Sequence, residues 1–580
     1  MTLVCYLWPS KWTVRFSTIL AAVLCTWSVL NAGWLIRTGT QILPRVLLPL
    51  FRSPLNALSI IGVNLIKMPI SAFTLLAPSA VALAFFFYVL IKTRIPTYNK
   101  RRLTIRITLS VIIIFASIIM RPAVIRRGSP RIASQGMKYN AQLKAVSSLF
   151  LDKDIKLPEP KRTIPFYDQV ELNVGTERAN PNIVLVILEG VQYRYTSFSV
   201  EKNNLTPFLE QFGEQGVVFE NARSTLSHTT KALFALLTGR YPSASQDIAE
   251  AVPVPKPYAS IATILKEQFH YRTAFFQSAM GDFESRPGLV SNIGFEKFFA
   301  RDDLNDPNSY VGYLGCDEFS MLEPVTEWIK SGEKPFLLTY LCSITHDPYD
   351  VPEWFEKPAK EQIDKYQQAI SYTDKFLAAL DVELNKLNIG NNSIFCVIGD
   401  HGEAFGEHGQ LGHAFIHFDE VLHIPFCIRA PFLIEPGTRV EKPVSSIDLT
   451  PTLLSMLGLQ IEEANFDGNN VLGNIADGRR VYFSGWMQEG PAGFVQNSQK
   501  IIYNPTDKTI YMYDLRTDPF EIIKKELAEQ EANKISKEII AWRQGTILKI
   551  RQEETGRRVL FNRWLCRWDD RDANAKYIKP

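Results

Sequence analysis

The sequence predicts an α/β fold with a mostly parallel central sheet flanked by helices, and three observations lead to this prediction. After residue 181, short apolar runs recur without polar alternation, as expected of strands buried on both faces. Segments with helical periodicity lie between these runs, so strand and helix alternate along the chain. Two of the runs stop abruptly at acidic residues, and the ends of parallel strands are where open α/β sheets bind ligands.

A strongly apolar region of 125 residues precedes this part of the chain. Residues 16–36 contain no charge over 21 positions, and residues 68–91 contain none over 24. Both stretches exceed the ~20 residues that a helix needs to cross a bilayer core. We therefore predict transmembrane helices at 16–36 and 68–91.

A third span is predicted at 107–125. Its uncharged part is short, so the span requires Arg106 and Arg121 to extend toward the interface. Residues 53–66 are equally short, and we interpret them as interfacial or re-entrant. Transmembrane helices at the N-terminus are thus part of the predicted fold.

The loop at 92–106 indicates the orientation of the chain. It carries six basic residues among 15 and no acid, which favours a cytoplasmic location. The third crossing then leaves the rest of the chain outside the cytoplasm, although the basic residues from 121 to 131 weaken this bias. We predict a multi-pass protein of the inner or plasma membrane, with its large domain extracytoplasmic.

Charge and cysteine content exclude some classes of partner. The net charge of +3 over 580 residues favours no polyanion, so no nucleic acid partner is expected. The seven cysteines are scattered without a Cys-x-x-Cys pair, which predicts neither a zinc knuckle nor a disulfide framework.

The order of elements follows from the apolar pattern. A polar connector at 126–180 leads into the α/β part, and beyond Gly458 shorter strands predict a small C-terminal sheet, then a helix at 521–550 and a charged tail. The expected strands are 182–188, 217–219, 272–276, 336–341, 394–398, 481–484, 500–503 and 509–513, and the expected helices are 205–213, 231–237, 260–268, 320–330 and 365–387.

Potential metal ligands follow two of the predicted strands. Glu189 comes directly after the first strand, and Asp400 with His401 comes directly after a later one. Carboxylates and imidazoles at strand ends suit a divalent cation with an open coordination position, and manganese, zinc or magnesium would each be accepted. Five of the eight histidines lie between 400 and 423, namely His401, His408, His413, His417 and His423.

A hydroxyl-rich segment precedes an apolar helix that Gly239 closes. Thr229 or Thr230 is expected to be the N-cap of this helix. The start of a helix also presents free amides and a positive dipole end to an anion. A threonine there becomes a nucleophile if a metal ion lowers the pKa of its hydroxyl.

Taken together, these motifs resemble the sulfatase and alkaline-phosphatase superfamily over residues 181–525. The similarity is greatest to its membrane-anchored branch of lipoteichoic acid synthases, phosphoglycerol transferases and phosphoethanolamine transferases. The motifs are Glu189-Gly190, Thr229 to Pro242 with its Leu-Thr-Gly-Arg-Tyr-Pro end, Thr345-His346-Asp347-Pro348-Tyr349, Tyr366 to Asp374, Asp400 to His413, Ser446 to Leu453, and Tyr513-Asp514-Leu515 with Asp518-Pro519-Phe520-Glu521.

The resemblance implies an alkaline-phosphatase/sulfatase-like fold with a catalytic domain at 181–475, a C-terminal subdomain at 476–525 and a helical, charged tail at 526–580. It also selects Thr229 as the nucleophile, ten positions before Gly239. True sulfatases carry a cysteine or serine that is oxidised to formylglycine. Because threonine cannot undergo that oxidation, the departure points to the phosphotransferase branch.

The resemblance further implies site roles and partners. A head group of the phosphoglycerol or phosphoethanolamine type would move from a phospholipid donor, through a phosphothreonine, to an envelope glycan or lipid acceptor. A sulfatase-like or phosphodiester hydrolase, and a non-catalytic binding relative, are the alternatives. The implied metal ligands are Glu189, Thr229, Asp400 and His401, the substrate-binding candidates are His346, His413, Lys231 and His228, and the residues that orient the histidines are Glu403, Glu420 and His408.

Overall fold

The structure of the chain is a computed structural model. Two compact units, residues 1–156 and 157–580, are treated separately below. The structure describes residues 8 and 10–38, a few short pieces up to residue 174, and 180–555 except for 200, 202–203, 245–247, 252–253, 255, 334, 414–416, 461–465, 487–490 and 505–508.

One long helix of the first unit is described, α2 at Lys11–Thr38, and it covers the predicted span at 16–36. Within the described residues, its Lys11–Val29 part alone is long and apolar enough to cross a membrane, a test of length and composition only. The predicted spans at 68–91 and 107–125, and the stretch at 53–66, lie largely outside the described residues.

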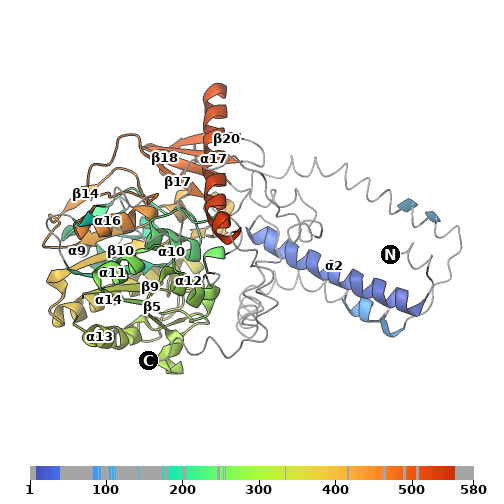
Figure 1. Ribbon diagram of the computed structural model, residues 1–580. Coiled ribbons are helices and arrows are strands. Elements are labelled where there is room, and N and C mark those ends of the chain that lie inside the picture. Colours follow the sequence, from blue (N-terminus) through green and yellow to red (C-terminus); the bar gives the residue numbers. More distant parts are fainter. Residues whose placement is uncertain are drawn as a thin grey trace. The chain divides into compact units, whose positions relative to one another are not determined.

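The second unit is built on an eight-stranded sheet of order β14-β3-β13-β10-β2-β9-β5-β6. Every neighbouring pair is parallel except the two that involve β13, which confirms the predicted mostly parallel sheet (Figure 1). The strands are β2 (Asn182–Leu188), β3 (Val217–Phe219), β5 (Arg272–Gln277), β6 (Lys297–Ala300), β9 (Phe336–Cys342), β10 (Ser393–Gly399), β13 (Phe426–Arg429) and β14 (Thr438–Val440).

Helices cover both faces of this sheet. Alternate side chains of β2 face opposite ways, so Ile183 and Leu185 belong to one apolar cluster and Val184 and Val186 to the other. Both faces of the sheet are therefore shielded from water, which explains why apolar and polar residues do not alternate along the strands. The first cluster packs α10 (Thr229–Thr238), α11 (Ile261–Phe269), α12 (Arg286–Ile293) and α16 (Leu449–Met456), and the second packs α9 (Pro207–Glu214), α13 (Leu322–Lys330) and α14 (Gln362–Lys386).

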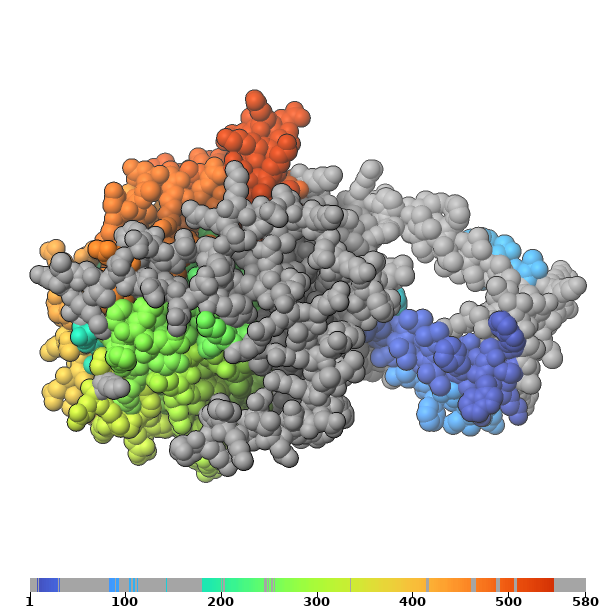
Figure 2. Space-filling view, in the orientation of Figure 1, coloured from blue at the N-terminus to red at the C-terminus, as the bar shows by residue number. Residues whose placement is uncertain are grey.

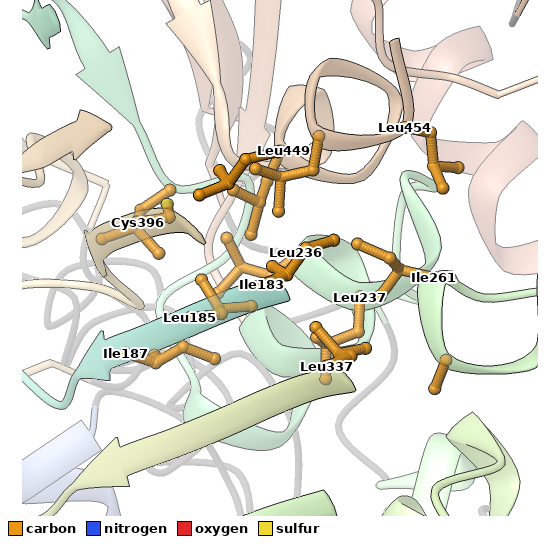
Figure 3. Close-up of a cluster of buried hydrophobic side chains, with 14 of the residues drawn as sticks. Ile183, Leu185, Ile187, Leu236, Leu237, Ile261, Leu337, Cys396, Leu449 and Leu454 are labelled. Carbon is orange, nitrogen blue, oxygen red and sulfur yellow. The ribbon is translucent and has the colours of Figure 1, made fainter. Parts of the chain in front are cut away.

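Figure 3 shows the first cluster in close-up, with side chains of β2 and α10 pointing toward one another. Leu236 and Leu237 of α10 lie against Ile183 and Leu185 of β2 and are almost completely inaccessible to solvent. Burial of such a side chain stabilises a fold by roughly 1.5–3 kcal/mol. This packing holds α10 against the sheet.

A separate antiparallel sheet follows, of order β17-β18-β19-β20-β21. Its residues and α17 (Glu529–Thr555) form an orange-to-red part of the molecular surface (Figure 2). The helix expected at 521–550 begins later than predicted, because Lys525–Glu526 pair with β20 as a strand. The strands of this sheet are β17 (Arg480–Ser484), β18 (Ala492–Gln496), β19 (Gln499–Asn504), β20 (Thr509–Asp514) and β21 (Lys525–Glu526).

Short elements complete the described part of the unit. They include α15 (Asp419–Leu422), which lies between His417 and His423. The two-stranded pairs are β1 (Asn173–Val174) with β16 (Leu459–Gln460), β4 (Ala222–Arg223) with β15 (Val444–Ser445), β7 (Tyr310–Val311) with β8 (Gly315–Cys316), and β11 (Ala404–Phe405) with β12 (Leu411–Gly412).

Candidate active site

Two carboxylates meet where β2 and β10 end. The strands are parallel neighbours with Leu188 opposite Gly399, so Glu189 and Asp400 follow at the same edge of the sheet. The Asp400 amide donates to the Leu188 carbonyl at 3.1 Å. Both carboxylates are buried. The register of two strands therefore suffices to bring together acids that are far apart in sequence.

The threonine hydroxyl at the start of α10 reaches the same point. Thr229 Oγ1 donates to Glu189 Oε1 at 2.9 Å and lies 3.1 Å from His401 Nε2. The prediction of Thr229 or Thr230 as N-cap was wrong, since His228 is the N-cap and Thr229 the first helical residue. The Thr229 hydroxyl points to the carboxylate instead of accepting a hydrogen bond from a helix amide.

The hydrogen bonds around His401 fix its tautomer. Its Nδ1 lies 2.9 Å from the Gly402 carbonyl, which can only accept, so Nδ1 carries the hydrogen. The Nε2 lone pair then faces Thr229 Oγ1, whose one hydrogen is already donated to Glu189. Asp400 Oδ2 lies 3.4 Å from the same nitrogen and is buried without a hydrogen-bond partner among the described residues. Glu189 Oε1, Thr229 Oγ1, His401 Nε2 and Asp400 Oδ2 thus lie close together, with one hydrogen among them.

Burial perturbs the acid–base behaviour of these groups. It raises the pKa of Glu189, and it raises the pKa of Asp400 to about 7. Burial also lowers the pKa of His401 to about 3, which keeps the ring neutral. Within the described residues, no group of three or more His, Cys, Asp or Glu side chains already stands as a metal site.

Two further histidines border this cluster. His346 Nε2 lies 3.9 Å from Glu189 Oε1, and its Nδ1 contacts the Asp347 carbonyl at 2.7 Å. Burial opposes protonation of His346, but the Glu189 charge and the Asp347 carbonyl outweigh it and raise the pKa. The His413 ring stacks on His401 with centroids 4.3 Å apart. His346 and His413 therefore lie beside the metal-ligand candidates.

The orienting candidates fall into two groups. Glu403 accepts from His413 Nδ1 at 2.9 Å, directly beside the cluster. Glu420 pairs with His408 at 2.9 Å, and His408 also contacts the Glu521 carbonyl at 3.2 Å. The Glu420–His408 pair thus links the histidine-rich segment to the C-terminal sheet region. The structure brings only Glu403 next to a ring at the site.

His423 lies away from this cluster. Its ring stacks on Tyr193, with centroids 4.0 Å apart, and its Nε2 contacts the Glu220 carbonyl at 2.9 Å. Burial lowers the pKa of His423 to about 3. These contacts give His423 a structural role apart from the cluster.

Lys231 and His228, both expected to bind substrate, have different surroundings. Lys231 Nζ lies 2.6 Å from Glu250 Oε2, and both side chains are completely buried. His228 Nε2 lies 3.2 Å from Glu284 Oε1, and its ring packs 3.8 Å from that of Trp486. The structure therefore directs Lys231 into the protein interior and His228 toward a polar cluster beside Thr229.

Sequence reasoning missed two members of that cluster, Glu284 and Arg286. Thr230 Oγ1 donates to Glu284 Oε2 at 2.8 Å, and Arg286 Nη2 lies 3.9 Å from the same oxygen. Burial opposes ionisation of Glu284, but His228 and Arg286 hold its pKa well below the usual range. Arg286 is buried, and its Nε and Nη1 have no hydrogen-bond partner among the described residues. The one local signal was an arginine directly before Pro-Gly.

Glu318 holds the loop that leads to His346. Its carboxylate accepts from Ser278 Oγ at 2.8 Å, from the Tyr340 hydroxyl at 2.6 Å and from the Ser343 amide at 2.9 Å. The ends of β5 and β9 are thereby tied together. Even with these donors, burial raises the pKa of Glu318 to about 7.

This shift predicts how stability depends on pH. The folded protein binds the Glu318 proton more tightly than the unfolded chain, whose pKa is 4.5. The free energy of unfolding should therefore fall by up to about 3 kcal/mol as pH rises from about 4.5 to 7. Thermal midpoints of the full chain and of Glu318→Gln across that range test this. Parallel pH profiles for the two proteins would contradict it.

Comparisons with known proteins place the domain that carries this site among sulfatase-like proteins. A family model described as Sulfatase matches residues 181–459. An ulvan-active sulfatase from Formosa agariphila is 24% identical over 327 residues, which are 50% of this chain and 63% of that protein. The lipoteichoic acid synthase-like YvgJ of Bacillus subtilis is 24% identical over 311 residues, 50% of this chain and 49% of that protein. The chain thus spans between about half and just under two thirds of the length of these relatives.

Solved structures show the same fold. A protein in the alkaline phosphatase superfamily from Vibrio parahaemolyticus has a TM-score of 0.55 at 21% identity, covering 69% of this chain and 93% of that one. The lipoteichoic acid synthase LtaP from Listeria monocytogenes has a TM-score of 0.52 at 19% identity, covering 65% and 96%. Residues 181–459 thus match the sulfatase family model, and the chain has the fold of the alkaline phosphatase superfamily.

Proposed function

We propose that this protein is a membrane-anchored, metal-dependent phosphotransferase. It moves a head group of the phosphoglycerol or phosphoethanolamine type from a phospholipid to an envelope glycan or lipid, through a phosphothreonine at Thr229. The observation that supports this most directly is the Thr229 hydroxyl, 2.9 Å from Glu189 and 3.1 Å from His401 at the start of α10. A threonine cannot supply the formylglycine of a sulfatase, but its hydroxyl can form a phosphodiester.

One divalent cation fits the residues at this point. Glu189, Asp400, His401 and Thr229 would hold it, since their acceptor atoms face one another with one hydrogen between them. The orphaned Oδ2 of Asp400 supports this assignment in particular. When bound, the cation would supply Lewis acidity that favours the alkoxide form of Thr229. Oxygen and imidazole ligands suit manganese, magnesium or zinc.

In the first half-reaction, Thr229 Oγ1 attacks the phosphorus of the donor and the bond to the diacylglycerol oxygen breaks. Glu189 accepts the hydroxyl hydrogen, to which it is already bonded. His346 gives a proton to the leaving oxygen: its Nδ1 donates to the Asp347 carbonyl, and the Glu189 charge beside Nε2 outweighs burial and raises the pKa of the ring, which favours a second proton on Nε2. An acceptor hydroxyl then attacks the phosphothreonine and passes its proton to the now neutral His346. The bond from phosphorus to Thr229 Oγ1 breaks, and Glu189 returns the hydrogen to that oxygen.

The phosphate would meet donors on more than one side. Arg286 offers Nε and Nη1, which are buried without a hydrogen-bond partner among the described residues. His413 lies against His401 and completes the imidazole side of the cluster. The amides at the start of α10 add a positive dipole end. Donors arranged in this way favour the charge that develops on the phosphoryl oxygens.

The proposed location is the inner or plasma membrane, with the catalytic domain outside the cytoplasm. The Lys11–Val29 segment of α2 supports an anchor by its length and composition. The charge bias of the loop at 92–106 supports the orientation. An anchor of this kind raises the effective concentration of the enzyme at its lipid substrate.

Intact-mass analysis of the full chain tests the proposal. Purified protein is incubated with manganese and mixed bacterial phospholipids, and its mass is compared with that of Thr229→Val. We expect an increment equal to a phospho head group, mapped to Thr229 and absent from the variant. Equal masses for the two proteins, together with turnover of the donor, would reject the covalent intermediate.

Metal binding can be tested without activity. Adding Mn²⁺ to the metal-stripped full chain should raise its thermal midpoint, since a ligand at about 100 times its Kd stabilises the folded state by ~2.7 kcal/mol. Asp400→Asn should lose most of this rise, whereas Glu220→Gln, at a half-exposed ion pair away from the cluster, should keep it. A full rise in Asp400→Asn would remove Asp400 from the ligand set.

A hydrolase that uses water as acceptor is the second candidate. It is favoured by the similarity to a protein named as a sulfatase. Both candidates share the first half-reaction, so the product separates them. Free head group in the presence of excess glycan or lipid acceptor indicates hydrolysis, and head group on the acceptor indicates transfer.

A further inference from the structure

A surface loop at 516–525, which follows β20, exposes large apolar side chains. Ile522 is 74% exposed, Ile523 61% and Phe520 44%. Adjacent exposed isoleucines are costly in water unless something covers them. This feature plays no part in the catalytic chemistry described above.

The loop is held rigidly in this conformation by its two acids, which turn inward. Asp518 accepts hydrogen bonds from the amides of Ile522 at 3.0 Å and Ile523 at 2.7 Å. Glu521 is buried, with φ at 54°, and its carboxylate contacts Lys500 Nζ at 2.8 Å. Because the backbone is fixed from inside, the isoleucine side chains are directed outward.

The basic and acidic residues of the loop differ in their exposure to solvent. Its three basic residues, Arg516, Lys524 and Lys525, are exposed, while Asp518 and Glu521 are buried. The exposed charge of 516–525 is therefore entirely positive, and Glu526 just beyond is the first exposed acid. Apolar side chains flanked by lysine and arginine suit an anionic membrane surface better than a neutral protein surface.

The loop is also joined to the segments that carry the candidate active site. The Glu521 carbonyl contacts His408 Nε2 at 3.2 Å, and the Glu521 carboxylate accepts from the Asp419 amide at 2.6 Å. The Arg194 guanidinium lies over the Phe520 ring, 4.9 Å from its centroid. Arg194 follows Glu189 by five residues. Contact of the loop with a bilayer would therefore bring these segments close to lipid.

We propose that the 516–525 loop docks on an anionic lipid bilayer. Ile522 and Ile523 enter the interface, and Arg516, Lys524 and Lys525 face the lipid phosphates. The inference deepens the proposed transfer from a phospholipid and rests on it for its catalytic benefit. A second copy of the chain is the other occupant that the test distinguishes.

The test places an environment-sensitive fluorophore on the loop of the full chain. Ile522→Cys is labelled in protein whose Cys5, Cys25 and Cys566 are replaced by serine, since the other four cysteines are buried. The protein is reconstituted in phosphatidylcholine vesicles with or without phosphatidylglycerol. Leu433→Cys, 51% exposed and without neighbouring exposed lysines, is the matched control.

With phosphatidylglycerol present, we expect a blue-shifted emission at position 522 and at least a twofold stronger quenching by lipid-borne quenchers than at 433. Emission typical of water at both positions would overturn the docking. A blue shift that depends on protein concentration but not on lipid-borne quenchers would also overturn it, in favour of a second copy.

An activity measurement separates this inference from the proposed function. The Ile522→Ser/Ile523→Ser variant should show about a tenfold higher KM for vesicle-borne donor, with unchanged turnover of a short-chain, water-soluble donor. The control Phe432→Ser/Leu433→Ser should change neither. If the Thr229 adduct forms while position 522 stays in water, docking is rejected and the proposed transfer stands. If the donor turns over without an adduct while lipid-borne quenchers act at 522, docking stands and the phosphothreonine intermediate is rejected.

Discussion

Replacing Thr229 with valine is expected to lower head-group transfer by at least about 10³-fold. Valine keeps the shape of threonine but has no hydroxyl to attack phosphorus. It also removes the hydrogen bond to Glu189 and the contact with His401. Thr229→Ser should retain part of the activity, because serine keeps the nucleophilic oxygen. Initial rates of diacylglycerol release from the donor measure the effect.

Thr238→Val is the control for this substitution. Thr238 lies at the other end of the same helix, is equally buried, and donates to the Phe234 carbonyl at 2.7 Å. The change therefore costs a comparable hydrogen bond without touching the site. We expect full activity in Thr238→Val. Similar losses in both variants would mean that the helix, not the Thr229 hydroxyl, explains the result.

The sequence alone predicted the parts of the fold that depend on local pattern. The run at 182–188 became β2 with the same bounds, because a strand buried on both faces must be apolar throughout. Gly239 closes α10 in the left-handed conformation that glycine adopts easily. The β18 strand at Ala492–Gln496 was missed, since only Phe494 and Val495 of its five residues favour a strand and Gly493 precedes them.

The sequence predicted which candidate site residues follow strand ends, but it missed the residues that tertiary structure brings beside them. Glu189 and Asp400 follow β2 and β10, so their proximity follows from parallel pairing. Glu284 comes from a loop between β5 and α12, with φ at 51°, and no periodicity marks that loop. Its contact with His228 depends on how α12 packs against α10. Such contacts cannot be read from spacing along the chain.

Lys231 shows the same limit, and it leads to the second large prediction. A lysine two positions after the proposed nucleophile was expected to bind substrate, yet its Nζ lies 2.6 Å from Glu250 and both groups are completely buried. Lys231→Met should therefore lower the free energy of unfolding by about 3–5 kcal/mol, because it leaves a buried carboxylate without its cation. The thermal midpoint of the full chain in detergent measures this loss.

The double variant Lys231→Met/Glu250→Gln distinguishes a structural from a substrate-binding lysine. In the double variant Glu250 is no longer a buried carboxylate without a cation. The double variant should therefore regain more than half of the stability lost by Lys231→Met. Its head-group transfer should recover in parallel, since α10 then holds Thr229 as before. If the double variant is stable but its KM for donor stays high, Lys231 contacts the substrate. If both stability and activity return, the lysine acts by fixing the helix that presents the nucleophile.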